Sequence, residues 1–102
     1  MPRALVIDDD DAIREMVALT LEASGFDVAR ARGARDARRE LETARPDVIL
    51  CDIYMPGGDG LSVLREVQAR PAPPPVILMT ARGSVETAAA AEEAGAVDYL
   101  AK

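Results

Sequence analysis

Two short apolar runs, Val48-Ile49-Leu50-Cys51 and Val76-Ile77-Leu78-Met79, constrain the fold more than any other feature of the chain. Each run stands between residues that break or turn the chain. A strand is apolar at every position when both of its faces are buried, which is typical of parallel sheets covered by helices on both sides. The two runs therefore predict an α/β fold.

The rest of the 102-residue chain alternates between strand-like and helical patterns. Further strands are expected at residues 4–7, 26–31 and 96–101, and helices at residues 11–24, 34–44, 61–69 and 84–93. In the first helix Asp10 or Asp11 can be the N-cap, Gly25 can end the helix, and one face carries Ile13, Met16, Val17, Thr20 and Leu21. This order predicts one domain, residues 1–102, built from right-handed βαβ units as a doubly wound five-stranded parallel sheet.

Composition excludes several functions. The formal net charge of −6 argues against nucleic-acid binding, and the arginines between residues 30 and 39 are interpreted mainly as a solvated helix face. The chain has no histidine, which excludes histidine acid–base catalysis and a Ser-His-Asp triad, and its single cysteine, Cys51, cannot form an internal disulfide. No apolar run approaches the roughly 20 residues that a membrane span needs, and no signal peptide is seen, so cytoplasmic residence is expected.

Polar residues follow the expected strands where each one ends. Ligands of doubly wound folds bind at the carboxyl ends of the strands, so these residues are expected to converge. They are Asp8, Asp9, Asp10 and Asp11 after the first strand, Asp52 after the third, Thr80 after the fourth and Lys102 after the fifth. Taken singly, each has an ordinary structural explanation, and Asp10 and Asp11 are interpreted chiefly as acids at a helix N-terminus.

The combination of these side chains indicates a particular chemistry. Clustered carboxylates repel one another unless a cation lies among them, and oxygen ligands without histidine or thiolate favour Mg²⁺. A carboxylate can also be a nucleophile that forms an aspartyl phosphate, while a metal ion and an ammonium group offset the charge on the phosphoryl group.

With these motifs in place, the chain resembles the receiver domains of two-component response regulators, which have the CheY fold. The resemblance covers essentially the whole chain and is closest, around Asp52, to the NtrC-like group. The residues that carry it are Leu5-Val6-Ile7-Asp8-Asp9-Asp10, Asp52-Ile53-Tyr54-Met55-Pro56-Gly57-Gly58-Asp59-Gly60, Met79-Thr80-Ala81 and Asp98-Tyr99-Leu100-Ala101-Lys102.

The resemblance implies a role for each site residue and a strand order of 2-1-3-4-5. Asp52 is similar to the phosphoacceptor of the family, and Lys102 to the residue that contacts the phosphoryl group. Thr80 and Tyr99 resemble the pair that moves on phosphorylation, while Tyr54 and Arg82 occupy positions where receivers vary the phosphoryl lifetime. The implied Mg²⁺ ligands are Asp8 (through a water), Asp9, Asp52 and the main-chain carbonyl of Tyr54.

The implied partners are a sensor histidine kinase, a fused or separate output domain, and a second copy in a homodimer. Receivers continue into a fifth helix, whereas this sequence ends at Lys102. A truncated chain, a natural short form and a partner that replaces the helix are all compatible with this end.

Two other functions compete with the phosphorylation switch. One is an aspartyl phosphatase, disfavoured because Tyr54 stands where a second acid is needed, and the other is a receiver-like module that is not phosphorylated.

Overall fold

The chain forms a five-stranded parallel sheet with strand order β2-β1-β3-β4-β5, as the sequence and the resemblance imply. The computed structural model describes residues 1–53, 60–80 and 98–101, with the main chain alone for residues 80 and 98–101. The strands are β1 (Arg3–Ile7), β2 (Asp27–Ala31), β3 (Val48–Asp52), β4 (Val76–Thr80) and β5 (Asp98–Ala101). The helices are α1 (Asp11–Ala23), α2 (Ala34–Thr43) and α3 (Gly60–Gln68). The helix expected at residues 84–93 lies outside the described residues.

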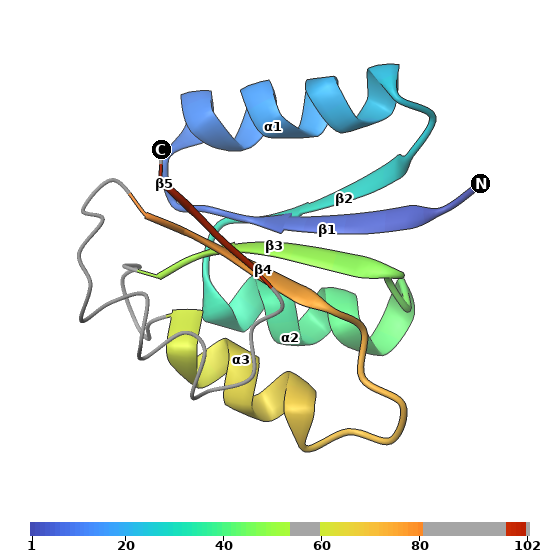
Figure 1. The fold of residues 1–102 in the computed structure, drawn as a ribbon, viewed down its shortest axis with the longest axis vertical. Helices are drawn as coiled ribbons and strands as arrows, with labels where there is room; N and C mark the ends of the chain where they lie inside the picture. The colour runs from blue at the N-terminus through green and yellow to red at the C-terminus, as the bar shows by residue number, and fades with distance from the viewer. Residues whose placement is uncertain (54–59, 81–97, 102) are drawn as a thin grey trace.

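Helices cover both faces of the sheet. Helix α1 lies on one face, and α2 and α3 lie together on the other (Figure 1). Alternate residues of β1 serve the two layers, since Leu5 and Ile7 pack with α2 and α3 while Ala4 and Val6 pack with α1. The two apolar runs of the sequence form β3 and β4 at the centre of the sheet, which explains why they lack the usual apolar–polar alternation.

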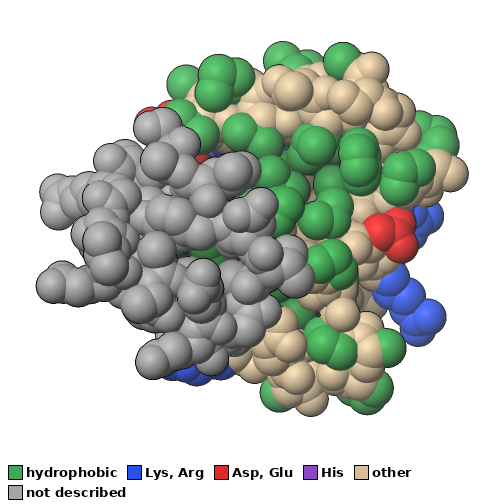
Figure 2. Space-filling model, in the orientation of Figure 1, with side chains coloured by type: hydrophobic (Ala, Val, Ile, Leu, Met, Phe, Trp, Pro, Cys, Tyr) green, Lys and Arg blue, Asp and Glu red, His purple; other side chains and the backbone are tan. Residues whose placement is uncertain are grey.

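Helix α1 buries part of the face predicted from the sequence, since Val17 and Leu21 pack against the sheet. Its N-cap is Asp10, whose carboxylate accepts a hydrogen bond from the Ile13 amide at 3.1 Å, and the chain turns after the helix at Gly25, whose φ is +96°. The expected apolar face included Met16 and Thr20, and this was wrong, because Met16 is 61% exposed and Thr20 is also exposed. The fully buried residue of α1 is Ala18, whose small side chain permits close approach of the helix to the sheet. Figure 2 shows hydrophobic side chains along α1 and in a band beneath it.

An ion pair joins the two helices of the opposite layer. The Arg38 guanidinium in α2 donates from Nε and Nη2 to the Glu66 carboxylate in α3, with a shortest distance of 2.7 Å. These hydrogen bonds lower the pKa of Glu66. The arginines at positions 32, 35, 38 and 39 are exposed, which agrees with the predicted solvated face, whereas Arg30 lies in β2 and pairs with Glu15 and Glu22 of α1.

The packing predicts unequal costs for two leucine truncations. Leu64→Ala in α3 should lower the free energy of unfolding by about 2–5 kcal/mol, because Leu64 is fully buried and its removal leaves a cavity. Leu19→Ala in α1 is the matched control and should cost under about 1 kcal/mol, because Leu19 is 60% exposed. Urea denaturation measures both values, and equal losses would contradict this account of the two layers.

Candidate functional site

The register of β1 against β3 brings two carboxylates together at the carboxyl edge of the sheet. Ile7 pairs with Cys51, so the next residue of each strand, Asp8 and Asp52, occupies neighbouring positions at the same edge. The ladder between β1 and β2 reaches Asp8, whose amide donates to Ala31 O at 3.0 Å, and the ladder between β3 and β4 continues one residue past Asp52, because the Ile53 amide donates to Met79 O at 2.9 Å. The main chain at Asp8 is therefore held by β2, and the main chain after Asp52 is held by β4.

Three carboxylates meet at this edge. Asp8, Asp9 and Asp52 each present an oxygen, and the three oxygens lie within 4.8 Å of one another. Asp8 is fully buried and Asp52 is 5% exposed, whereas Asp9 is exposed to solvent. Burial of two adjacent carboxylates is costly unless cations or hydrogen-bond donors compensate their charge. A set of hard oxygen ligands at this spacing could hold a metal ion.

The acids next to this cluster have structural roles, as the sequence predicted. The Asp8 carboxylate accepts a hydrogen bond from the Asp10 amide at 3.0 Å, and Asp10 in turn caps α1. Asp11 lies in the first turn of α1 and accepts a hydrogen bond from Arg14 at 2.6 Å. Arg14 was not predicted from the sequence, although its spacing of three residues from Asp11 is typical of an ion pair on a helix.

A close approach of α3 to β3 shapes the other side of the site. The Gly60 amide donates to Ile53 O at 2.6 Å, which closes the segment between the end of β3 and the start of α3. A Cβ atom at Gly60 would collide with the main-chain oxygen of Asp52 and lie 2.8 Å from Ile53 Cα. Glycine is therefore required here by space next to Asp52.

The remaining predicted site residues are placed only in part. Thr80 ends β4, the strand beside β3, and therefore reaches the same edge of the sheet. Tyr99 lies in β5 and pairs with Leu78 of β4. Tyr54, Arg82 and Lys102 lie outside the described residues. The roles of these five residues remain predictions.

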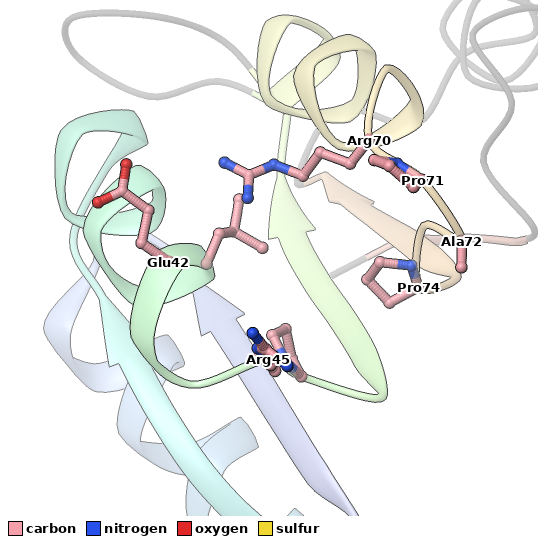
Figure 3. A pocket seen from close by; sticks show the side chains of 8 residues that line it. Glu42, Arg45, Arg70, Pro71, Ala72 and Pro74 are labelled. Atoms are coloured by element: carbon pink, nitrogen blue, oxygen red, sulfur yellow. The ribbon is translucent and has the colours of Figure 1, made fainter.

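An open cleft of about 550 Å³ lies away from the acidic cluster (Figure 3). Its walls are the end of α2, the connection from α2 to β3, and the connection from α3 to β4, so it stands at the amino ends of the strands. Arg70 extends across it in Figure 3, and two residues in its walls, Arg45 and Ala72, have φ of 45° and 48°. None of the three clustered acids lines this cleft.

A parallel sheet covered on both faces, with three carboxylates at its carboxyl edge, defines a CheY-like α/β domain. The chain belongs to the response regulator receiver domain family, whose model matches residues 4–102. Two curated relatives are AtoC of Escherichia coli K12, 41% identical over 98% of this chain and 22% of AtoC, and NtrC of Klebsiella pneumoniae, 38% identical over 97% of this chain and 21% of NtrC. The chain thus spans about a fifth of the length of these relatives.

Solved structures give the same result. A putative response regulator from Chloroflexus aurantiacus has a TM-score of 0.93 and 37% identity, with 100% of this chain and 86% of that chain covered. A response regulator from Burkholderia pseudomallei, solved with a phosphorylated aspartic acid, a calcium ion and citrate, has a TM-score of 0.92 and 27% identity, with 100% and 60% covered. Within the described residues, the structure contains no helix with the length and apolar character of a membrane span.

Gly60→Ala should destabilise the domain by about 1–3 kcal/mol, because the new methyl group forces α3 away from the main chain of Asp52 and Ile53. Gly25→Ala tests a different cause, since a Cβ atom there meets nothing within 4 Å and the cost of about 1–2 kcal/mol comes from the positive φ alone. Urea denaturation and two-dimensional amide spectra report the two effects. The close approach would be disproved by a Gly60 variant that matched the parent in stability and left the amide signals around Asp52 unmoved.

Proposed function

We propose that this domain is a phosphorylation switch of a two-component system, which accepts a phosphoryl group on Asp52 with Mg²⁺ bound. The observation that carries the proposal is the position of Asp52, which ends a central strand with oxygens of Asp8 and Asp9 close to its carboxylate. Family membership and the phosphorylated aspartic acid of the Burkholderia pseudomallei relative support the same assignment.

The proposed metal ligands are the carboxylates of Asp9 and Asp52, with Asp8 acting through a water and the Tyr54 carbonyl completing the set. Carboxylate and carbonyl oxygens suit Mg²⁺, which keeps several of its waters when it binds to proteins. When bound, Mg²⁺ would offset the negative charge of the carboxylates and of the incoming phosphoryl group. The calcium ion in the Burkholderia pseudomallei structure is consistent with a divalent cation in this family.

The residues of this chain would then act in sequence. A carboxylate oxygen of Asp52 forms a bond to phosphorus as the bond between phosphorus and a histidine nitrogen of the kinase breaks. Asp52 ends β3, which pairs with β1 on one side and β4 on the other, so the main chain that carries its carboxylate is held in place before the phosphoryl group arrives. Lys102 would contact the phosphoryl group, and Thr80 and Tyr99 would change position in response.

The proposed partners are a sensor histidine kinase, an output domain and a second copy of the domain. The relatives AtoC and NtrC extend far beyond the matched region, and transcription regulation by such a protein would belong to its other parts. The domain would act as a switch that assists its own phosphoryl transfer and hydrolysis. Cytoplasmic residence, where kinase and Mg²⁺ are available, is part of the same proposal.

Acetyl phosphate with Mg²⁺ should add the mass of one phosphoryl group to the parent, measured by intact mass spectrometry. Asp52→Asn should abolish the gain, because an amide is not a nucleophile for this transfer, and a chelator should prevent it in the parent. Asp27→Asn is the control. Asp27 lies at the opposite edge of the sheet and is not a phosphoacceptor, so this variant should gain the same mass as the parent. The proposal fails if the parent gains no mass or if Asp52→Asn gains as much as the parent.

Mg²⁺ should also stabilise the fold, by about 2.7 kcal/mol at a concentration of one hundred times Kd. Asp9→Asn should remove most of this gain in thermal denaturation, because it deletes a charged ligand from the cluster. Asp27→Asn makes the same change in charge away from the cluster and should keep the full gain. Equal stabilisation of the parent and Asp9→Asn by Mg²⁺ would show that Asp9 does not bind the ion.

A further inference from the structure

The side chain of Arg14 folds back from α1 onto the acidic segment Asp8–Asp11, which is the loop after β1 and the first residue of α1. It is 11% exposed, although arginine is rarely buried to this degree without partners. Its Nη1 donates to the main-chain oxygen of Asp8 at 3.1 Å, and its Nη2 donates to Asp11 Oδ1 at 2.6 Å. One guanidinium thus joins the beginning of the loop to the first residue of α1.

These contacts fix the main chain on both sides of Asp9. Asp8 is held at its carbonyl by Arg14 and at its carboxylate by the Asp10 amide, and Asp10 is held in turn by its N-cap bond to Ile13. Asp9 lies between two residues that are both fixed, and it is the exposed member of the carboxylate cluster. The direction of its carboxylate therefore depends on the loop, because burial does not hold it in place.

We propose that Arg14 is a positioning residue, which holds the loop so that Asp9 faces Asp8 and Asp52 before the metal ion arrives. This inference rests on the proposed function and adds a determinant of metal affinity to it. Arginine suits the role because its planar fork presents two donors in a fixed geometry to two acceptors, which the single ammonium of lysine does not reproduce. Residues that orient metal ligands typically contribute about 10–100-fold to metal affinity.

The sign of the effect separates positioning from simple electrostatics. A positive charge near the cluster repels a divalent cation, so its removal should tighten Mg²⁺ binding if charge alone matters. If Arg14 positions the loop, its loss should instead weaken Mg²⁺ binding, because the entropic cost of ordering the loop is then added to the free energy of binding. The two explanations predict opposite changes in Kd for the same substitution.

Isothermal titration with Mg²⁺ should therefore give a Kd about 10-fold or more above the parent value for Arg14→Met. Arg14→Lys keeps the charge and the stem but loses the fork, so most of the same loss is expected. Arg38→Met is the matched control, because it deletes one positive charge from an ion pair between α2 and α3, and it should bind Mg²⁺ as the parent does. At saturating Mg²⁺, the rate of phosphorylation of the Arg14 variants by acetyl phosphate should approach that of the parent.

A tighter or unchanged Kd in Arg14→Met, or a parental Kd in Arg14→Lys, would overturn the positioning role. A parent chain that binds no Mg²⁺ would instead refute the proposed metal site, which keeps the two failures apart. Circular dichroism and thermal denaturation establish that each variant is folded. If Arg14→Met does not fold, Arg14→Lys alone decides the outcome, because its charge is retained and only the paired hydrogen bonds are lost.

Discussion

The pairing of β1 with β3 is the constraint on which the rest of the structure depends. Ile7 is paired with Cys51, so the residue after each lies at the same edge of the sheet, and these two residues are Asp8 and Asp52. A slip of one residue would turn every buried side chain of a strand to the other face and would separate the two acids. Leu5, Ile7, Ile49 and Cys51 are all fully buried or nearly so, and the packing of helices on both faces fixes this register. Packing of the apolar core thus fixes the positions of Asp8 and Asp52, although the polar site lies at the edge of the sheet outside the core.

The same arrangement explains how the fold tolerates neighbouring acids. Asp8 is inaccessible to solvent, but its carboxylate receives the Asp10 amide and its carbonyl receives Arg14. The N-terminus of α1 follows directly and adds the favourable positive end of the helix dipole. Gly60 lets α3 begin against the main chain of Asp52, so the second acid is also close to a helix start. Main-chain amides and the Arg14 guanidinium hold the loop between β1 and α1 in place. The repulsion that remains among the three carboxylates favours binding of a cation between them.

Much of this organisation could be predicted from the sequence, because it depends on patterns that are local in the chain. The apolar runs at β3 and β4 identified the parallel sheet, and the acids that end the strands identified the edge where Asp8, Asp9 and Asp52 meet. The buried face of α1 was predicted only in part: Val17 and Leu21 do pack against the sheet, but a helical period fits a stripe through Met16 as well as one through Ala18, and only packing against the sheet chooses between them. The role of Gly60 and the contacts of Arg14 depend on the distance between elements and on a side-chain conformation, which no residue pattern specifies.

The two helical layers support the acidic edge by different physical means. On the face of α2 and α3, large apolar side chains from three strands interlock, and Arg38 joins the helices to each other. Such packing is dense and leaves little freedom to the end of β3. On the other face, α1 meets the sheet through a smaller cluster around Ala18, with Met16 and Leu19 left exposed. The loop before α1 carries only the acidic side chains of Asp8, Asp9 and Asp10, so apolar packing of its own residues cannot fix its shape. The loop between β1 and α1 is therefore the part of the site whose shape has to come from directed hydrogen bonds, and Arg14 together with Asp10 supplies them.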